Sequence, residues 1–342
     1  MSTRSTRTMH QPARLLILLM VLVTAMLFAS LAGAQEETGG FDTPGAPITE
    51  EAAAAFVERY DAIFGEPAME TADEILAEDF VAHLPLAPEL DRSGWKAYVD
   101  SFRSGSSDLT HHMDAWFVDG DRLIAHATIR GTHDGPLFGV PATGNSIEIT
   151  GQGVFRFNEE GQVTESWVVL DLAALLAQIG ALPAEGSTVQ VGTDGLTTPG
   201  ATISDAAAAA FVERFDALFN EPNIDIADEI FAEDFVGHLP LAPELDRAGW
   251  KAYVDMFRAG ASDTTQRTNR YFVADDRLIL HVTYSGTHDG TLFGVPATGN
   301  PIEMNGIGIF RFNDDGLAAD NWAVLDLANV FAQIGALPAP AE

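Results

Sequence analysis

Apolar residues recur at helical spacing through the first third of the repeating unit. In TEEAAAAFVERYDAIFG they lie on one face of a helix that follows Thr49 as N-cap and stops at Gly65. The same spacing predicts two more helices, over residues 70–80 and 93–105. The aromatic residues in these helices are spaced for burial, so we interpret them as core.

From residue 110 onward the pattern changes to strand-like alternation of apolar and polar positions. This alternation predicts two hairpins, over residues 111–131 and 146–171, and a short helix over residues 172–182 closes the unit. Helices followed by consecutive strands predict an α+β domain, in which the helices cover one side of a mostly antiparallel sheet.

The whole unit occurs twice. With an offset of 155 residues, 43–182 aligns to 198–337 without a gap, and 93 of the 140 positions are identical. Each copy has the size of an independent domain, so two similar domains are predicted. The stretch 183–197 is rich in Gly, Thr and Ser and is interpreted as a linker. Short segments at 35–42 and 338–342 remain as an N-terminal extension and a tail.

Strand alternation also sorts side chains into faces. The last strand of each copy carries a Trp and, four residues later, an Asp, and the strand before the first long loop carries a His. We expect these side chains to face a cavity. They are Trp167, Asp171 and His126 in the first copy and Trp322, Asp326 and His281 in the second.

The segment 1–34 is typical of a signal peptide. Three arginines precede the apolar run LLILLMVLVTAMLF, and small residues follow up to Ala34, where we expect cleavage. The run is too short for a membrane-spanning helix, which needs about 20 residues. The chain is therefore expected to be exported, and since it has no cysteine, its stability must come from packed cores rather than disulfides.

The chain is strongly acidic, with 18 basic and 50 acidic side chains and a formal net charge of −32. Removal of the segment 1–34 takes away three arginines and no acidic residue, which leaves 15 minus 50, or −35. This charge disfavours nucleic acid as a partner, and no membrane contact is expected after cleavage. The acidic residues are spread over both copies, as on a solvated surface.

The loop GTHDGPLFGVPATGN at residues 131–145 returns almost unchanged at 286–300. Its glycines and proline suit a chain that turns tightly between two strands, and Phe138 is placed to plug a cavity. Two roles are open for His133: contact with a ligand, or a hydrogen bond that fixes the loop. The same interpretations apply to the matching residues His288 and Phe293.

His83 and its counterpart His238 lie in an identical HLPLAPELDR context and are further candidates for a pocket. The first copy offers one set of three histidines as possible metal ligands, namely His83, His126 and His133. Their spacing does not match zinc-binding patterns, so no metal is expected.

The series EDFVAHLPLAPELDRSGW, GTHDGPLFGVPATGNSIEI and GVFRFNEEGQVTESWVVLDLAALLAQIG resembles the SnoaL-like polyketide cyclases, or ester cyclases, of the NTF2-like superfamily. The resemblance covers essentially the whole of each copy. It implies two tandem cone-shaped barrels, each a curved, mostly antiparallel sheet covered by N-terminal helices around an apolar pocket. It further implies aldol-type ring closure without a cofactor, with Asp171 and Asp326 as acid/base residues and His83 or His133 stabilising the enolate oxygen.

Two functions remain open at this point. An enzyme would use Asp171, whose pKa would rise in a poorly hydrated pocket beside Trp167, for proton transfer on a small apolar carbonyl compound. A non-catalytic module would use the same cone only to bind a small molecule or to pair domains, and Asp171 would then cap the helix that starts at Leu172. Because members of the superfamily pair through their sheets, we expect the two copies to form an intramolecular pseudo-dimer.

Overall fold

The computed structural model describes residues 41–65, 69–182 and 191–337. The elements of the first domain are α2 (Glu50–Gly65), α3 (Glu70–Ile75), β1 (Leu76–His83), β2 (Leu90–Asp91), α4 (Arg92–Gly105), β3 (Thr110–Asp119), β4 (Arg122–Thr132), β5 (Ser146–Phe157), β6 (Val163–Leu170) and α5 (Leu172–Gln178). Those of the second are α6 (Asp205–Asn220), the 3-10 turn η2 (Ile224–Ile226), α7 (Ala227–Ile230), β7 (Phe231–His238), α8 (Arg247–Gly260), β8 (Thr265–Ala274), β9 (Arg277–Thr287), β10 (Pro301–Phe312), β11 (Ala318–Leu325) and α9 (Leu327–Gln333).

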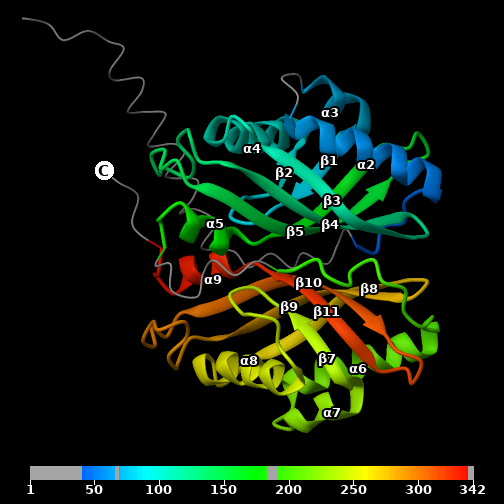
Figure 1. The fold of residues 1–342 in the computed structure, drawn as a ribbon, viewed down its shortest axis with the longest axis vertical. Helices are drawn as coiled ribbons and strands as arrows, with labels where there is room; N and C mark the ends of the chain where they lie inside the picture. The colour runs from blue at the N-terminus through cyan, green and yellow to red at the C-terminus, as the bar shows by residue number, and fades with distance from the viewer. Residues whose placement is uncertain (1–40, 66–68, 183–190, 338–342) are drawn as a thin grey trace, which may run out of the picture.

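Each domain is an α+β unit with one curved sheet, as predicted. The strand order is β2-β1-β6-β5-β4-β3 in the first sheet and β7-β11-β10-β9-β8 in the second. The β1–β6 and β7–β11 pairs are parallel and the other pairs are antiparallel. Helices α2, α3 and α4 cover the outer face of the first sheet, and α6, α7 and α8 cover that of the second (Figure 1). Among the described residues neither sheet closes into a barrel, because β2 and β3 end the first sheet and β7 and β8 end the second.

The predicted helix over residues 70–80 is wrong in its second half. Helix α3 ends at Ile75, and β1 begins at Leu76 and pairs with β6. In β1 the buried residues Phe80 and Ala82 alternate with partly or fully exposed ones. This period of two matches a strand, but over so few residues it resembles a helical pattern.

The two sheets pack against each other through the faces that their helices leave uncovered (Figure 1). We call this contact the seam. Its buried apolar residues form one cluster: Phe41, Ala115, Ile124, Val154, Trp167, Val169, Val191, Leu196, Phe272, Ala274, Ile279, Ile307, Ile309, Trp322 and Val324. Polar contacts cross it as well, among them a hydrogen bond of 3.0 Å from Gln152 Nε2 to the carbonyl of Trp322.

Segments outside the two domains contribute to the seam. Phe41, from the predicted N-terminal extension, stacks on Trp167 with ring centroids 4.0 Å apart. Leu196, which matches Phe41 in the repeat, is buried in the same cluster, so the described part of the predicted linker is packed against the domains. The predicted signal peptide at 1–34 lies outside the described residues. Within the described residues no helix has the length and apolarity to span a membrane.

Candidate functional site

The repeated loop 131–145 is fixed by its own side chains. The imidazole Nδ1 of His133 lies 2.9 Å from the Thr143 hydroxyl, and its backbone carbonyl accepts from the N–H groups of Thr143 and Gly144. Gly135 lies so close to helix α4 that a Cβ there would come within 1.9 Å of the Ser104 carbonyl oxygen. His288 makes the same 2.9 Å contact with Thr298. The contacts of both histidines are therefore those of the loop-fixing role.

The loop also places one aromatic side chain near helix α4. Phe138 is the one large apolar residue that the described chain leaves exposed, at 39%, and its backbone has a positive φ of 49°. Its ring meets Phe102 edge-on at 5.5 Å, and Phe293 meets Phe257 in the same way at 5.7 Å. Phe138 and Phe293 therefore pack on the third predicted helix of their copies.

Asp171 directly follows β6 and is fully buried. One carboxylate oxygen, Oδ1, accepts from the backbone N–H of Ala174 at 3.0 Å, so the side chain is the N-cap of α5. The other oxygen, Oδ2, has no hydrogen-bond partner among the described residues. Burial raises the pKa of the Asp171 carboxyl to about 7, although the Ala174 bond acts in the opposite direction. Asp326 caps α9 in the same way through Asn329, at 3.2 Å.

The expected juxtaposition of Asp171 and Trp167 is wrong. Trp167 lies in the seam, whereas the neighbours of Asp171, Leu170 and Leu172, belong to a different cluster, which joins the core of the first cone to α9 and part of the second cone. The strand ends at Leu170 and the backbone turns at Asp171, with ψ of 66°, so the alternation of faces does not continue to the aspartate. Trp322 lies in the seam as well.

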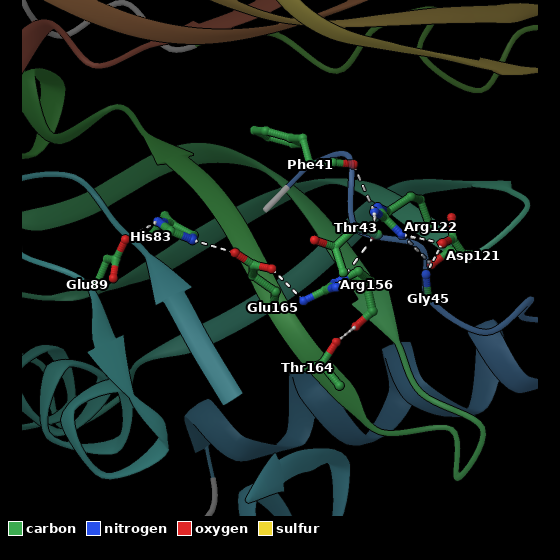
Figure 2. Close-up of polar contacts among 10 residues, drawn as sticks. All are labelled: Phe41, Thr43, Gly45, His83, Glu89, Asp121, Arg122, Arg156, Thr164 and Glu165. Carbon is green, nitrogen blue, oxygen red and sulfur yellow. Dashed lines mark hydrogen bonds and ion pairs between the residues drawn. The ribbon is translucent and has the colours of Figure 1, made fainter. Parts of the chain in front are cut away.

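His83 also lies at the seam and not beside Asp171. Its Nε2 is 2.9 Å from Glu165 Oε1, and the other oxygen of Glu165 accepts from Arg156 at 2.5 Å (Figure 2). The imidazole stacks on Trp167 with the planes 3° apart, and His238 stacks on Trp322 in the same way. These contacts hold both histidines against the seam tryptophans.

His126 and His281 are buried in the seam from opposite sides. Gln152 Nε2 donates to His126 Nδ1 at 3.0 Å, and burial, with a smaller contribution from His238, lowers the pKa of His126 to about 4. The ring of His281 packs against that of Phe41, with ring centroids 4.5 Å apart. Four of the predicted site histidines thus gather at the contact between the two sheets. Sequence alternation cannot reveal this, because it does not say what covers the second face of a sheet.

The second cone encloses a cavity of about 30 Å³, room for about one or two water molecules. Its wall is mostly apolar and includes Phe215, Trp250 and Met304, with polar groups from Tyr253, Tyr284 and Asn321. None of these residues was a candidate from sequence. The available signal was the difference between the copies: Tyr284, Met304 and Asn321 replace Ile129, Ile149 and Ser166. Among the described residues, no group of three or more His, Cys, Asp or Glu side chains is arranged to hold a metal.

Comparison with known proteins places both copies in one family. The family model described as SnoaL-like polyketide cyclase matches residues 54–179 and 209–334. No curated protein matches the chain. Among solved structures, TsrD from Streptomyces laurentii is 27% identical and is similar over 40% of this chain and 99% of its own, with a TM-score of 0.37.

Two further structures are similar over a comparable length. IdmH, a putative polyketide cyclase from Streptomyces antibioticus, is 26% identical over 37% of this chain and 98% of its own, with a TM-score of 0.35. A putative SnoaL-like polyketide cyclase from Jannaschia is 21% identical over 41% of this chain and 100% of its own, with a TM-score of 0.37. Because the family model matches twice and together covers more than half of the sequence, the chain belongs to the SnoaL-like polyketide cyclase family, with two tandem domains of it.

Proposed function

We propose that the cones bind a small, apolar molecule with a carbonyl group and that Asp171 catalyses proton transfer on it without a cofactor. The observation that carries this proposal is the state of the Asp171 carboxyl. It is fully buried, its pKa is raised to about 7, and its Oδ2 has no partner among the described residues. A carboxyl with these properties changes protonation near neutral pH, as a general base requires.

The chemistry that fits is aldol-type ring closure or a related isomerisation. The Asp171 carboxylate takes a proton from the carbon next to a carbonyl, and the resulting enolate carbon attacks a second carbonyl to form the new C–C bond. The carboxylic acid then returns the proton to the new alkoxide. The proposal assigns no part to His83, because Glu165 holds its imidazole at the seam.

A second candidate is a module that binds a ligand without catalysis. The observation that favours it is the structural use of both aspartates, since Asp171 Oδ1 caps α5 and Asp326 caps α9. In this case the raised pKa of Asp171 is a by-product of a buried helix cap.

Turnover separates the two candidates. Purified protein is first examined by native mass spectrometry for a bound small molecule, and that compound or a library of small diketones and keto-esters is then tested as substrate. Catalysis by Asp171 predicts loss of turnover in Asp171→Asn, which keeps the cap, and no loss in Asp91→Asn, which alters an exposed cap on α4. An active Asp171→Asn protein removes Asp171 from the chemistry.

We also propose that the chain is exported and works as an intramolecular pseudo-dimer. Export is supported by the three arginines and the apolar run within residues 1–34. The pairing is supported by the apolar seam and by the Gln152–Trp322 hydrogen bond across it. N-terminal sequencing of exported protein should start at or near Gln35, and a start at Met1 contradicts processing. Sedimentation should give a monomer of the whole chain; a dimer of chains contradicts self-contained pairing.

A further inference from the structure

One pair of matched positions differs between the two cones in hydrogen bonding. In the first cone the Tyr60 ring lies beside Trp95, with ring centroids 5.7 Å apart, so its hydroxyl oxygen is an acceptor close to an indole that can only donate. In the second cone Phe215 stands at the position that matches Tyr60, whereas the position that matches Trp95 is again a tryptophan, Trp250. Trp250 is 3% exposed, and its Nε1 has no hydrogen-bond partner among the described residues. The exchange of Tyr for Phe therefore removes the acceptor but keeps the donor.

The cavity of the second cone lies where this acceptor is absent. Phe215 and Trp250 both line it. In the second cone Phe215 and Trp250 belong to one cluster, whereas Met304 and Leu325 belong to the cluster that also holds the core of the first cone, and the cavity touches both clusters. The matching residues of the first cone belong to a single continuous cluster.

Two other polar groups at the cavity are already used. The Tyr253 hydroxyl donates to the carbonyl of Pro240 at 3.2 Å, and Asn321 Nδ2 donates to that of Ile309 at 3.3 Å. A buried N–H without an acceptor is unfavourable, and it gains most from a ligand that supplies one. The indole of Trp250 thus offers a directional donor inside an apolar wall.

We propose that the Trp250 indole N–H is the recognition donor of the second cone and that it selects a small apolar ligand with one acceptor oxygen, such as a ketone. This inference rests on the proposed binding function and adds to it the group that recognises the acceptor oxygen of the ligand. It also makes the two cones unequal, because Tyr60 occupies the equivalent acceptor position in the first. A ligand larger than the present cavity must displace lining side chains such as Met304 or Leu325.

The test follows the five tryptophan indole signals of the full chain by ¹H–¹⁵N NMR, with Trp250 assigned from Trp250→Phe. Acetone is the ligand that has an acceptor oxygen, and xenon under pressure is the apolar ligand that has none. Entry of either ligand into the cavity is followed by the change in the NMR signal of the Met304 methyl group. Acetone should shift the Trp250 N–H signal and xenon should not. Phe215→Tyr should weaken acetone binding at least tenfold.

Trp250→Phe keeps an aromatic ring but lacks the N–H, so it serves if Phe215→Tyr does not fold. It should weaken acetone binding about tenfold and leave the xenon response unchanged. If acetone shifts Met304 but not the Trp250 N–H, or if Tyr284→Phe alone abolishes acetone binding, the proposal is overturned while the binding function stands. If neither probe reaches Met304, both the proposal and the binding function of this cone fail.

Discussion

Replacing Asp171 by Asn removes the charge of a buried carboxyl and keeps an oxygen that can accept from Ala174. In the folded protein burial raises the pKa of this carboxyl from 3.8 to about 7. The folded state therefore binds more protons than the unfolded state between about pH 4 and pH 7, and stability must fall as the pH rises through this window. Asn does not ionise, so the variant lacks this loss.

The size of the effect follows from the shift in pKa. Each unit corresponds to about 1.36 kcal/mol, so a rise of about three units gives about 4 kcal/mol. At pH 4 the carboxyl is protonated in the folded state and about half protonated in the unfolded state, so wild type and Asp171→Asn should unfold at free energies within about 1 kcal/mol of each other. Above pH 7 the variant should be the more stable, by up to about 4 kcal/mol. Asp171→Ala lacks the cap oxygen and should lose about 1 kcal/mol of this gain.

Urea unfolding between pH 4 and pH 8 measures the difference in free energy of unfolding between wild type and Asp171→Asn. The other acidic groups are common to both proteins, so their contributions cancel in this difference. Asp91→Asn is the matched control. Asp91 caps α4 at the surface, and the backbone hydrogen bond from Gly94 lowers its pKa, so its charge should be favourable above pH 4. A gain in Asp171→Asn that does not change with pH, or a loss of stability at pH 8, would refute the assignment of a poorly solvated charge.

Two more predictions concern the seam. Burial lowers the pKa of His126 to about 4, so the free energy of unfolding of wild type should fall by up to about 3 kcal/mol between pH 6.5 and pH 4. His126→Asn should reduce this loss, and urea unfolding that shows the same dependence on pH for wild type and variant would contradict the prediction. Phe41→Ala should lower the free energy of unfolding by about 3–5 kcal/mol, as measured by chemical unfolding. Phe41→Leu, which introduces the residue found at the matching position Leu196, should lower it by less than about 1.5 kcal/mol. Equal losses in the two variants would show that Phe41 is not packed in the seam.

The sequence predicted what local pattern controls. The repeat, the α+β class and the hairpins all depend on spacing within a few residues or on direct comparison of the copies, and the cap at Asp171, which was one of two open roles, is also a local contact. The fixing of the loop by His133 and Thr143 was one of two interpretations, and it too is a contact within one loop.

What could not be predicted is which face of each sheet forms the cone. Strand β4 is buried at eight consecutive residues, because one face packs on its own helices and the other on the second domain. Alternation then no longer distinguishes a pocket from an interface. For this reason Trp167 and His126 were assigned to a cavity and lie in the seam. Trp250 was not a candidate from sequence because its proposed role depends on the exchange of Tyr60 for Phe215 between the copies. This exchange becomes informative only once Phe215 and Trp250 are seen to line the same cavity.

The most direct test of ligand binding uses the methyl group of Met304, which lines the second cavity. Selective ¹³C labelling of the methionine methyls reports on both cones at once, since Met113 lies in the core of the first. In a screen of small carbonyl compounds against the full chain, at least one compound should shift the Met304 signal with saturation and compete with xenon. If no compound shifts the Met304 signal, while the signal itself is sharp and assigned through Met304→Leu, the second cone is not a binding site for small carbonyl molecules.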